Sequence, residues 1–108
     1  EGGAPEGEDP LVGAKRELLE ETGLTAEEWT PLQRVHLSNS VTDEVAEIYL
    51  ACGLKKVSDP KPEASEELTL KRLTLKEAVG MVHAGEITDA VSVIGLMQAW
   101  KFTTETQR

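Results

Sequence analysis

Four aliphatic residues recur at helical spacing near the start of this sequence: Leu11, Val12, Leu18 and Leu19. Asp9 and Pro10 precede and open this stretch, in the order that is typical of an N-cap and the first helical position. Gly23 follows it, where a left-handed residue commonly ends a helix. The pattern therefore predicts a helix over residues 10–22.

The remaining hydrophobic pattern predicts, in order, a short helical turn at 25–28, strands over 29–36, 44–54 and 68–73, a helix between Thr74 and Gly85, and a final helix from Asp89 through Trp100. Thr74 and Glu77 have the spacing of a capping box. The polar residues 102–108 are expected to fray. A chain of 108 residues has room for a single core, so we predict one domain over residues 1–108.

The net charge of −9 changes the range of partners that this domain is expected to bind. Binding to nucleic acid or to an anionic membrane needs a basic face, so we expect neither partner. No apolar run approaches the roughly 18 residues that a membrane helix requires. Cys52 is the single cysteine, which rules out an intrachain disulfide and favours the reducing cytoplasm. Its place in an apolar strand predicts a buried side chain.

The negative charge is concentrated at the start, where residues 1–24 hold seven acidic and two basic side chains. On a helix, Glu17, Glu20 and Glu21 project from nearly one side, roughly opposite the aliphatic stripe. Carboxylates grouped in this way suit a hard divalent cation such as Mg²⁺ or Mn²⁺. A solvated acidic helix face has the same short pattern, so the longer spacing around it decides between the two interpretations.

That longer pattern is Gly2, five residues, Glu8, seven residues, Arg16-Glu17-Leu18, one residue, Glu20-Glu21, one residue and Gly23-Leu24. It fills every fixed position of the Nudix box, G-x5-E-x7-R-E-U-x-E-E-x-G-U, where U is a bulky aliphatic residue. The sequence therefore resembles the Nudix hydrolases. This resemblance implies an α/β/α sandwich with a mixed sheet, and the hydrolysis of a nucleoside diphosphate linked to another moiety. Because the sequence starts at the box, we expect the strands that precede it in the family to be missing from this chain.

The resemblance also assigns roles to residues of the box. Glu17 and Glu21 would be the main metal ligands, and Glu20 would be either a third ligand or a ligand through water. Arg16 would pair with a box glutamate, Glu20 or Glu8, and hold it in place. With these roles, Arg16 and Glu20 belong to the catalytic group.

Three residues at the start of the box complete the implied site. A backbone carbonyl before the box glycine often binds metal in this family, and that position falls on Glu1. Gly2 and Gly3 would let the backbone approach the substrate. The metal would neutralise the diphosphate and acidify the attacking water.

The second half of the sequence, EVAEIYLACGL from residue 44 and the stretch from 68 to 100, resembles the ADP-ribose pyrophosphatase branch. This implies that ADP-ribose or a related nucleotide sugar is cleaved to AMP and a sugar phosphate. The general base in that branch is a glutamate in the loop before the last strand, where this chain offers Glu63, Glu66 and Glu67; we favour Glu66. Glu44, at a junction of loop and strand, is either a substrate contact or a simple strand-end charge.

Part of the branch pattern is altered, because Ser38-Asn39-Ser40 lacks the proline and glycine found there in many ADP-ribose hydrolases. Other Nudix substrates therefore remain alternatives: GDP-mannose, dinucleoside polyphosphates and oxidised nucleoside triphosphates. A module that binds a nucleotide sugar and regulates without cleaving it is a further alternative. Members of the branch commonly form dimers, which implies a homodimer. His36 and His83 have no partner at the spacing of a zinc site.

Overall fold

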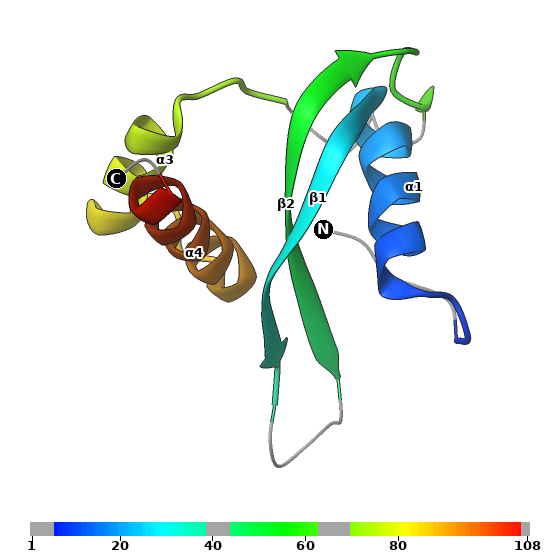
Figure 1. Ribbon diagram of the computed structural model, residues 1–108. Coiled ribbons are helices and arrows are strands. Elements are labelled where there is room, and N and C mark those ends of the chain that lie inside the picture. The colour runs from blue at the N-terminus through cyan, green and yellow to red at the C-terminus, as the bar shows by residue number, and fades with distance from the viewer. Residues whose placement is uncertain (1–5, 39–43, 63–69, 107–108) are drawn as a thin grey trace. The chain divides into compact units, whose positions relative to one another are not determined.

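The computed structural model describes residues 6–38, 44–62 and 70–106 (Figure 1). Its elements are helix α1 (Pro10–Thr22), strand β1 (Leu24–His36), strand β2 (Val45–Lys56), helix α3 (Leu75–His83) and helix α4 (Ala90–Thr106). The α/β class predicted from the sequence is confirmed. Within the described ranges, no helix is long and apolar enough to cross a membrane.

Helix α1 has the bounds and both caps that the sequence predicts. The Asp9 side chain accepts a hydrogen bond from the backbone N–H of Leu11 at 2.8 Å, and Pro10 occupies the start of the helix. At the other end, Gly23 adopts φ 74°, and its N–H donates to the Leu19 carbonyl at 2.8 Å. These bonds satisfy backbone groups that have no partner inside the helix.

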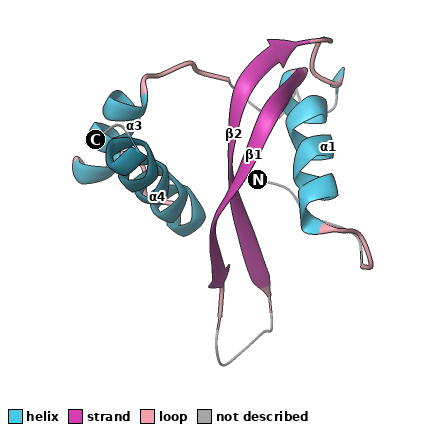
Figure 2. Cartoon of the chain, viewed as in Figure 1, coloured by secondary structure: helices cyan, strands magenta, loops and turns pink. Residues whose placement is uncertain are grey.

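Strands β1 and β2 pair antiparallel, and together they make up the two-stranded sheet of the described residues (Figure 2). The Leu37 N–H donates to the Glu44 carbonyl at 3.0 Å beyond the strand ends. The helical turn predicted at 25–28 is wrong, because these residues belong to β1. A cross-strand neighbour explains the difference: Gly53 of β2 lies so close to Glu27 that an added Cβ would meet the Glu27 Cβ at 2.9 Å. Pairing with β2 thus outweighs the local preference of four residues.

The chain divides into two compact units. The first comprises Glu1–Thr30 and Ala51–Lys71, and the second comprises Pro31–Leu50 and Arg72–Arg108. Each strand contributes one part to each unit. The boundary in β1 falls at Pro31, which cannot donate a ladder hydrogen bond. That residues 1–108 form a single domain stays a prediction.

In the second unit, α3 packs against α4. Gly95 of α4 lies near Ile48 of β2, where an added Cβ would meet Ile48 Cγ2 at 3.4 Å, about van der Waals distance. Thr74 and Glu77 form the predicted capping box at the start of α3. The buried hydrophobic residues of the described chain all lie on these two helices: Ala78, Val79 and Ala99.

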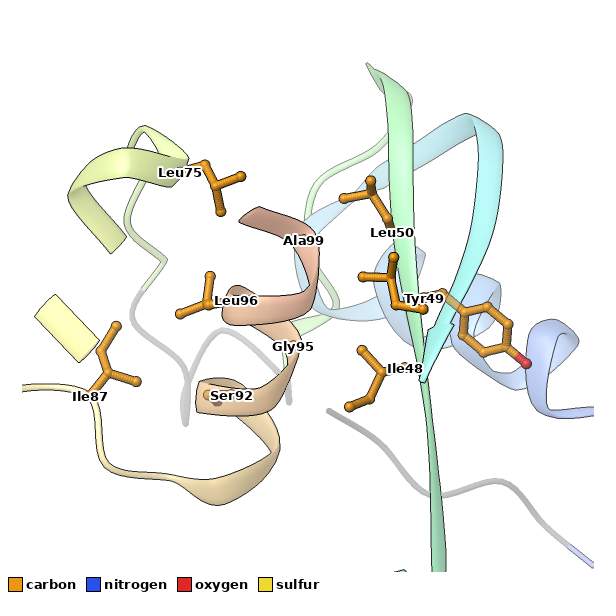
Figure 3. A pocket seen from close by; sticks show the side chains of 10 residues that line it. Ile48, Tyr49, Leu50, Leu75, Ile87, Ser92, Gly95, Leu96 and Ala99 are labelled. Atoms are coloured by element: carbon orange, nitrogen blue, oxygen red, sulfur yellow. The ribbon is translucent and has the colours of Figure 1, made fainter. Parts of the chain in front are cut away.

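An open apolar pocket of about 550 Å³ lies within the second unit (Figure 3). Aliphatic side chains from β2, α3 and α4 line it, among them Ile48, Leu50, Leu75 and Leu96. A pocket of this kind suits apolar groups.

Three further predictions about elements and burial are wrong. Residues 70–73 of the strand predicted at 68–73 are irregular, and the other two lie outside the described residues; a strand needs a neighbour, and the described sheet pairs only β1 with β2. Of the tail predicted to fray, residues 102–106 continue α4, with the Thr103 and Thr104 hydroxyls bonded to the preceding turn, and 107–108 lie outside the described residues. Cys52 is exposed rather than buried, in the part of β2 where residues 52–56 are all exposed.

The aliphatic stripe of α1 also differs from expectation. Val12 and Leu19 are 55% and 38% exposed, while the side chains of Glu17 and Glu20 are 22% and 28% exposed. Leu11 and Leu18 of the same stripe are half-buried, as Glu17 and Glu20 are, so the acidic side is covered about as much as the aliphatic one. The chain before α1 and the loop after β2 both contact this acidic side, as described next.

Candidate functional site

Arg16 lies at the centre of a group of carboxylates on α1. Its Nη2 is 3.0 Å from Glu8 Oε1, and its Nη1 is 2.9 Å from Glu17 Oε1 and 3.5 Å from Glu20 Oε2. We call Arg16, Glu8, Glu17 and Glu20 the Arg16 cluster. The resemblance implies that Arg16 pairs with Glu20 or Glu8, and the structure places Arg16 near both.

Local sequence explains this geometry. Glu20 follows Arg16 by four positions, so the two side chains project from the same side of the helix. Glu8 lies before the helix, and the turn at Gly7, with φ 85°, precedes it. The planar guanidinium has donors on both sides, so it can bond a carboxylate from the loop and another from the helix at once.

The electrostatics of the cluster follow from this crowding. The pKa of Arg16 is raised because the Glu8 and Glu17 carboxylates accept hydrogen bonds from its guanidinium. The pKa of Glu21 is raised above its ordinary value chiefly because its surroundings desolvate it, with the nearby Glu17 and Glu20 carboxylates adding to the effect. Arg16 therefore stays protonated, while the proton is held more firmly on Glu21 than on a solvated glutamate.

A second cation reaches the cluster from the loop that follows β2. Lys61 Nζ is 3.2 Å from Glu20 Oε1, and the Lys61 backbone N–H donates to the Glu20 carbonyl at 2.9 Å. The same loop donates from Val57 and Ser58 to the Gly23 carbonyl, at 2.9 and 3.3 Å. The end of α1 and this loop are thus joined by backbone bonds as well as by an ion pair.

The contact of Lys61 with Glu20 did not follow from the sequence. The two residues are 41 positions apart, and Lys61 lies between two prolines in a polar loop. An acidic helix beside an unassigned lysine is too common a combination to indicate a pair. Only the crossing of the loop over Gly23 brings them together.

The other predicted site residues fall into two groups. Glu44 belongs to the second unit, whereas the Arg16 cluster belongs to the first. The others lie outside the described residues: Glu1, Gly2, Gly3, Glu63, Glu66 and Glu67. Their roles stay predictions.

The chemistry of the donors fits a hard divalent cation, because Glu17, Glu20 and Glu21 offer carboxylate oxygens along one side of α1. In the ranges that the structure describes, no three His, Cys, Asp or Glu side chains converge closely enough to hold a metal ion. Arg16 draws Glu17 and Glu20 toward its guanidinium, and Lys61 draws the second oxygen of Glu20.

Comparison with known proteins gives one family and several relatives. The family model of the NUDIX domain matches residues 1–94. An ADP-ribose pyrophosphatase of Mycobacterium tuberculosis is 34% identical over 99 residues, which are 91% of this chain and 48% of the relative. An ADP-ribose pyrophosphatase of Bacillus subtilis is 36% identical over 86 residues, 78% of this chain and 46% of the relative.

A third relative has a different kind of name. The methanol dehydrogenase activator of Bacillus methanolicus is 38% identical over 91 residues, 83% of this chain and 49% of the relative. The chain thus spans about half the length of each of these curated relatives.

Proposed function

Because this chain belongs to the NUDIX domain family, we propose that it carries the catalytic box of a pyrophosphatase that hydrolyses a nucleoside diphosphate linked to another moiety. The substrate that we favour is ADP-ribose or a related nucleotide sugar, cleaved to AMP and a sugar phosphate. Two relatives named ADP-ribose pyrophosphatase support this choice. The observation that carries the proposal is the group of half-buried carboxylates around Arg16: Glu17 and Glu20 on α1, and Glu8 before it.

The chain's own residues would divide the work as follows. Glu17 and Glu21 would hold a divalent cation, Mg²⁺ or Mn²⁺, with the Glu1 carbonyl and Glu20 as additional ligands. A cation bound there would neutralise the diphosphate and make a water molecule easier to deprotonate. Arg16 would keep the carboxylates in place, and its contacts with Glu8 and Glu17 support this role.

Residues beyond the described ranges would complete the reaction. We assign to Glu66 the role of the base that takes the proton of the attacking water, with Glu63 and Glu67 as alternatives. Gly2 and Gly3 would allow the backbone to approach the diphosphate, and Glu44 would contact the substrate. We propose a cytoplasmic homodimer as the working form; the exposed apolar residues Val12 and Leu19 are consistent with a covering partner.

The test is a substrate panel with Mg²⁺ or Mn²⁺: ADP-ribose, GDP-mannose, diadenosine polyphosphates and an oxidised nucleoside triphosphate, with products identified by mass. We expect AMP from ADP-ribose. Glu17→Gln and Glu21→Gln should each lower turnover at least about 100-fold, more than loss of a group that merely supports a ligand. The matched control is Glu28→Gln, which makes the same change at an exposed position of β1. Near-normal turnover by both α1 variants would contradict the proposal.

A second candidate function is regulation of another enzyme, because one relative is named as an activator. A regulatory module would bind the nucleotide sugar and release no product. Tight binding of ADP-ribose with no AMP formed, at saturating Mg²⁺, would favour this candidate over hydrolysis.

A further inference from the structure

Glu20 has a cation against each of its carboxylate oxygens. Arg16 Nη1 lies 3.5 Å from Oε2, and Lys61 Nζ lies 3.2 Å from Oε1. Direct binding of a divalent cation through either oxygen would place two positive groups beside each other. One of the two ion pairs would therefore have to open before Glu20 could become a direct ligand.

Lys61 is better fixed than an ordinary surface lysine. Its side chain is 62% exposed, but its backbone N–H is bonded to the carbonyl of Glu20, the same residue that its ammonium contacts. The preceding part of the loop is bonded to Gly23, one turn further along the chain. The backbone that carries Lys61 is therefore attached to the end of α1 and places the start of its side chain beside Glu20, although the side chain still loses its own freedom on forming the ion pair.

We propose that Lys61 is a positioning residue that keeps Glu20 from binding the metal directly. Glu17 and Glu21 then supply the direct carboxylate ligands, and Glu20 reaches the metal through water. This inference rests on the proposed function, because it concerns the metal that the box would hold. It decides between the two roles that the resemblance leaves open for Glu20, and it assigns a role to a residue outside the box.

The consequence is a metal affinity that Lys61 lowers. Removing its charge frees one oxygen of Glu20, and the number of water molecules on the metal should fall as Glu20 replaces one. A partly exposed ion pair contributes little, so the change in affinity should be about two- to fivefold. The effect depends on Glu20 and should vanish where Glu20 cannot bind metal.

The experiment measures Mn²⁺ binding by calorimetry, and the waters on bound Mn²⁺ by pulsed electron paramagnetic resonance in D₂O. Lys61→Met should bind Mn²⁺ about two- to fivefold more tightly than Lys55→Met. Lys55 provides the matched control, because it is an exposed lysine of the same unit and its loss changes the net charge equally. Lys61→Arg should resemble the parent. In a Glu20→Gln background, Lys61→Met should have no further effect, which is the test of coupling.

Equal affinities of Lys61→Met and Lys55→Met would overturn the role of Lys61, and so would weaker binding by Lys61→Met or an unchanged water count. Persistence of the effect in the Glu20→Gln background would overturn it as well. These results leave the proposed function in place if the parent binds Mn²⁺ and Glu17→Gln does not. A parent that binds no Mn²⁺ would contradict the proposed function and this inference together.

Discussion

Gly23 joins the end of α1, the start of β1 and the loop after β2, so its replacement tests the geometry of the first unit. Gly23→Ala would introduce two faults. The residue has φ 74°, a region that a side chain disfavours. In addition, the new Cβ would lie 1.9 Å from the backbone oxygen of Ser58, far inside a permissible contact.

The structure allows the two costs to be estimated separately. The left-handed conformation alone costs about 1 kcal/mol for alanine. To relieve the overlap, the Ser58 carbonyl would have to retreat by about 1 Å, which strains the bonds from Val57 and Ser58 to the Gly23 carbonyl. Each backbone hydrogen bond contributes roughly 0.5–1.5 kcal/mol. The free energy of unfolding should therefore fall by about 2–4 kcal/mol in total.

Gly85→Ala is the matched control, because Gly85 has φ 76° and open space where a Cβ would be added. It should lose only the conformational part, about 1 kcal/mol. Urea unfolding in the presence of EDTA, followed by tryptophan fluorescence, measures both losses; Trp29 lies in the first unit and Trp100 in the second. If Gly23→Ala lost no more stability than Gly85→Ala, the close crossing of the loop over Gly23 would be refuted. The delivery of Lys61 to Glu20 would lose its basis with it.

Two more predictions concern the ionisation of Glu21 and the second unit. When a carboxyl group has a higher pKa in the folded than in the unfolded state, the protein loses stability as the pH rises through those two pKa values. For Glu21 this loss begins near its ordinary pKa of 4.5. Without metal, Glu21→Gln should therefore be more stable than the parent at pH 7, by roughly 0.2–0.5 kcal/mol, because the repulsion with Glu17 is lost. Below pH 4 the two proteins should be equally stable. Melting curves in EDTA that showed the parent to be more stable at pH 7 would contradict this. Thr74→Ala removes the capping box with Glu77 and should lower the free energy of unfolding by about 1 kcal/mol, measured with urea. Its Mn²⁺ affinity should stay that of the parent, and a change would show that the cap influences the metal ligands.

The parts of the fold that could be predicted are those that depend on neighbouring residues. Asp9 and Gly23 mark the two ends of α1, and the sequence predicts both because a cap needs only the backbone groups of its own helix. The capping box of α3 is equally local. The segment 25–28 was predicted wrongly because its short-range preference competes with pairing to β2, a strand that starts 17 residues after residue 28. The exposure of Cys52 has the same origin, since burial depends on which elements cover a strand.

The site shows the same division between local and distant contacts, with a consequence for its chemistry. Helical spacing alone places Glu20 beside Arg16, so the sequence predicts the internal half of the cluster. The sequence also indicates that so many carboxylates need a positive partner, and it predicts a metal ion as that partner. The structure adds that part of this need is met by Lys61, which a distant loop delivers. Lys61 contacts Glu20, which would leave Glu17 and Glu21 as the direct carboxylate ligands of a metal. The lysine and the metal would thus not compete for the same carboxylate. Instead, Lys61 would determine which carboxylates the metal binds.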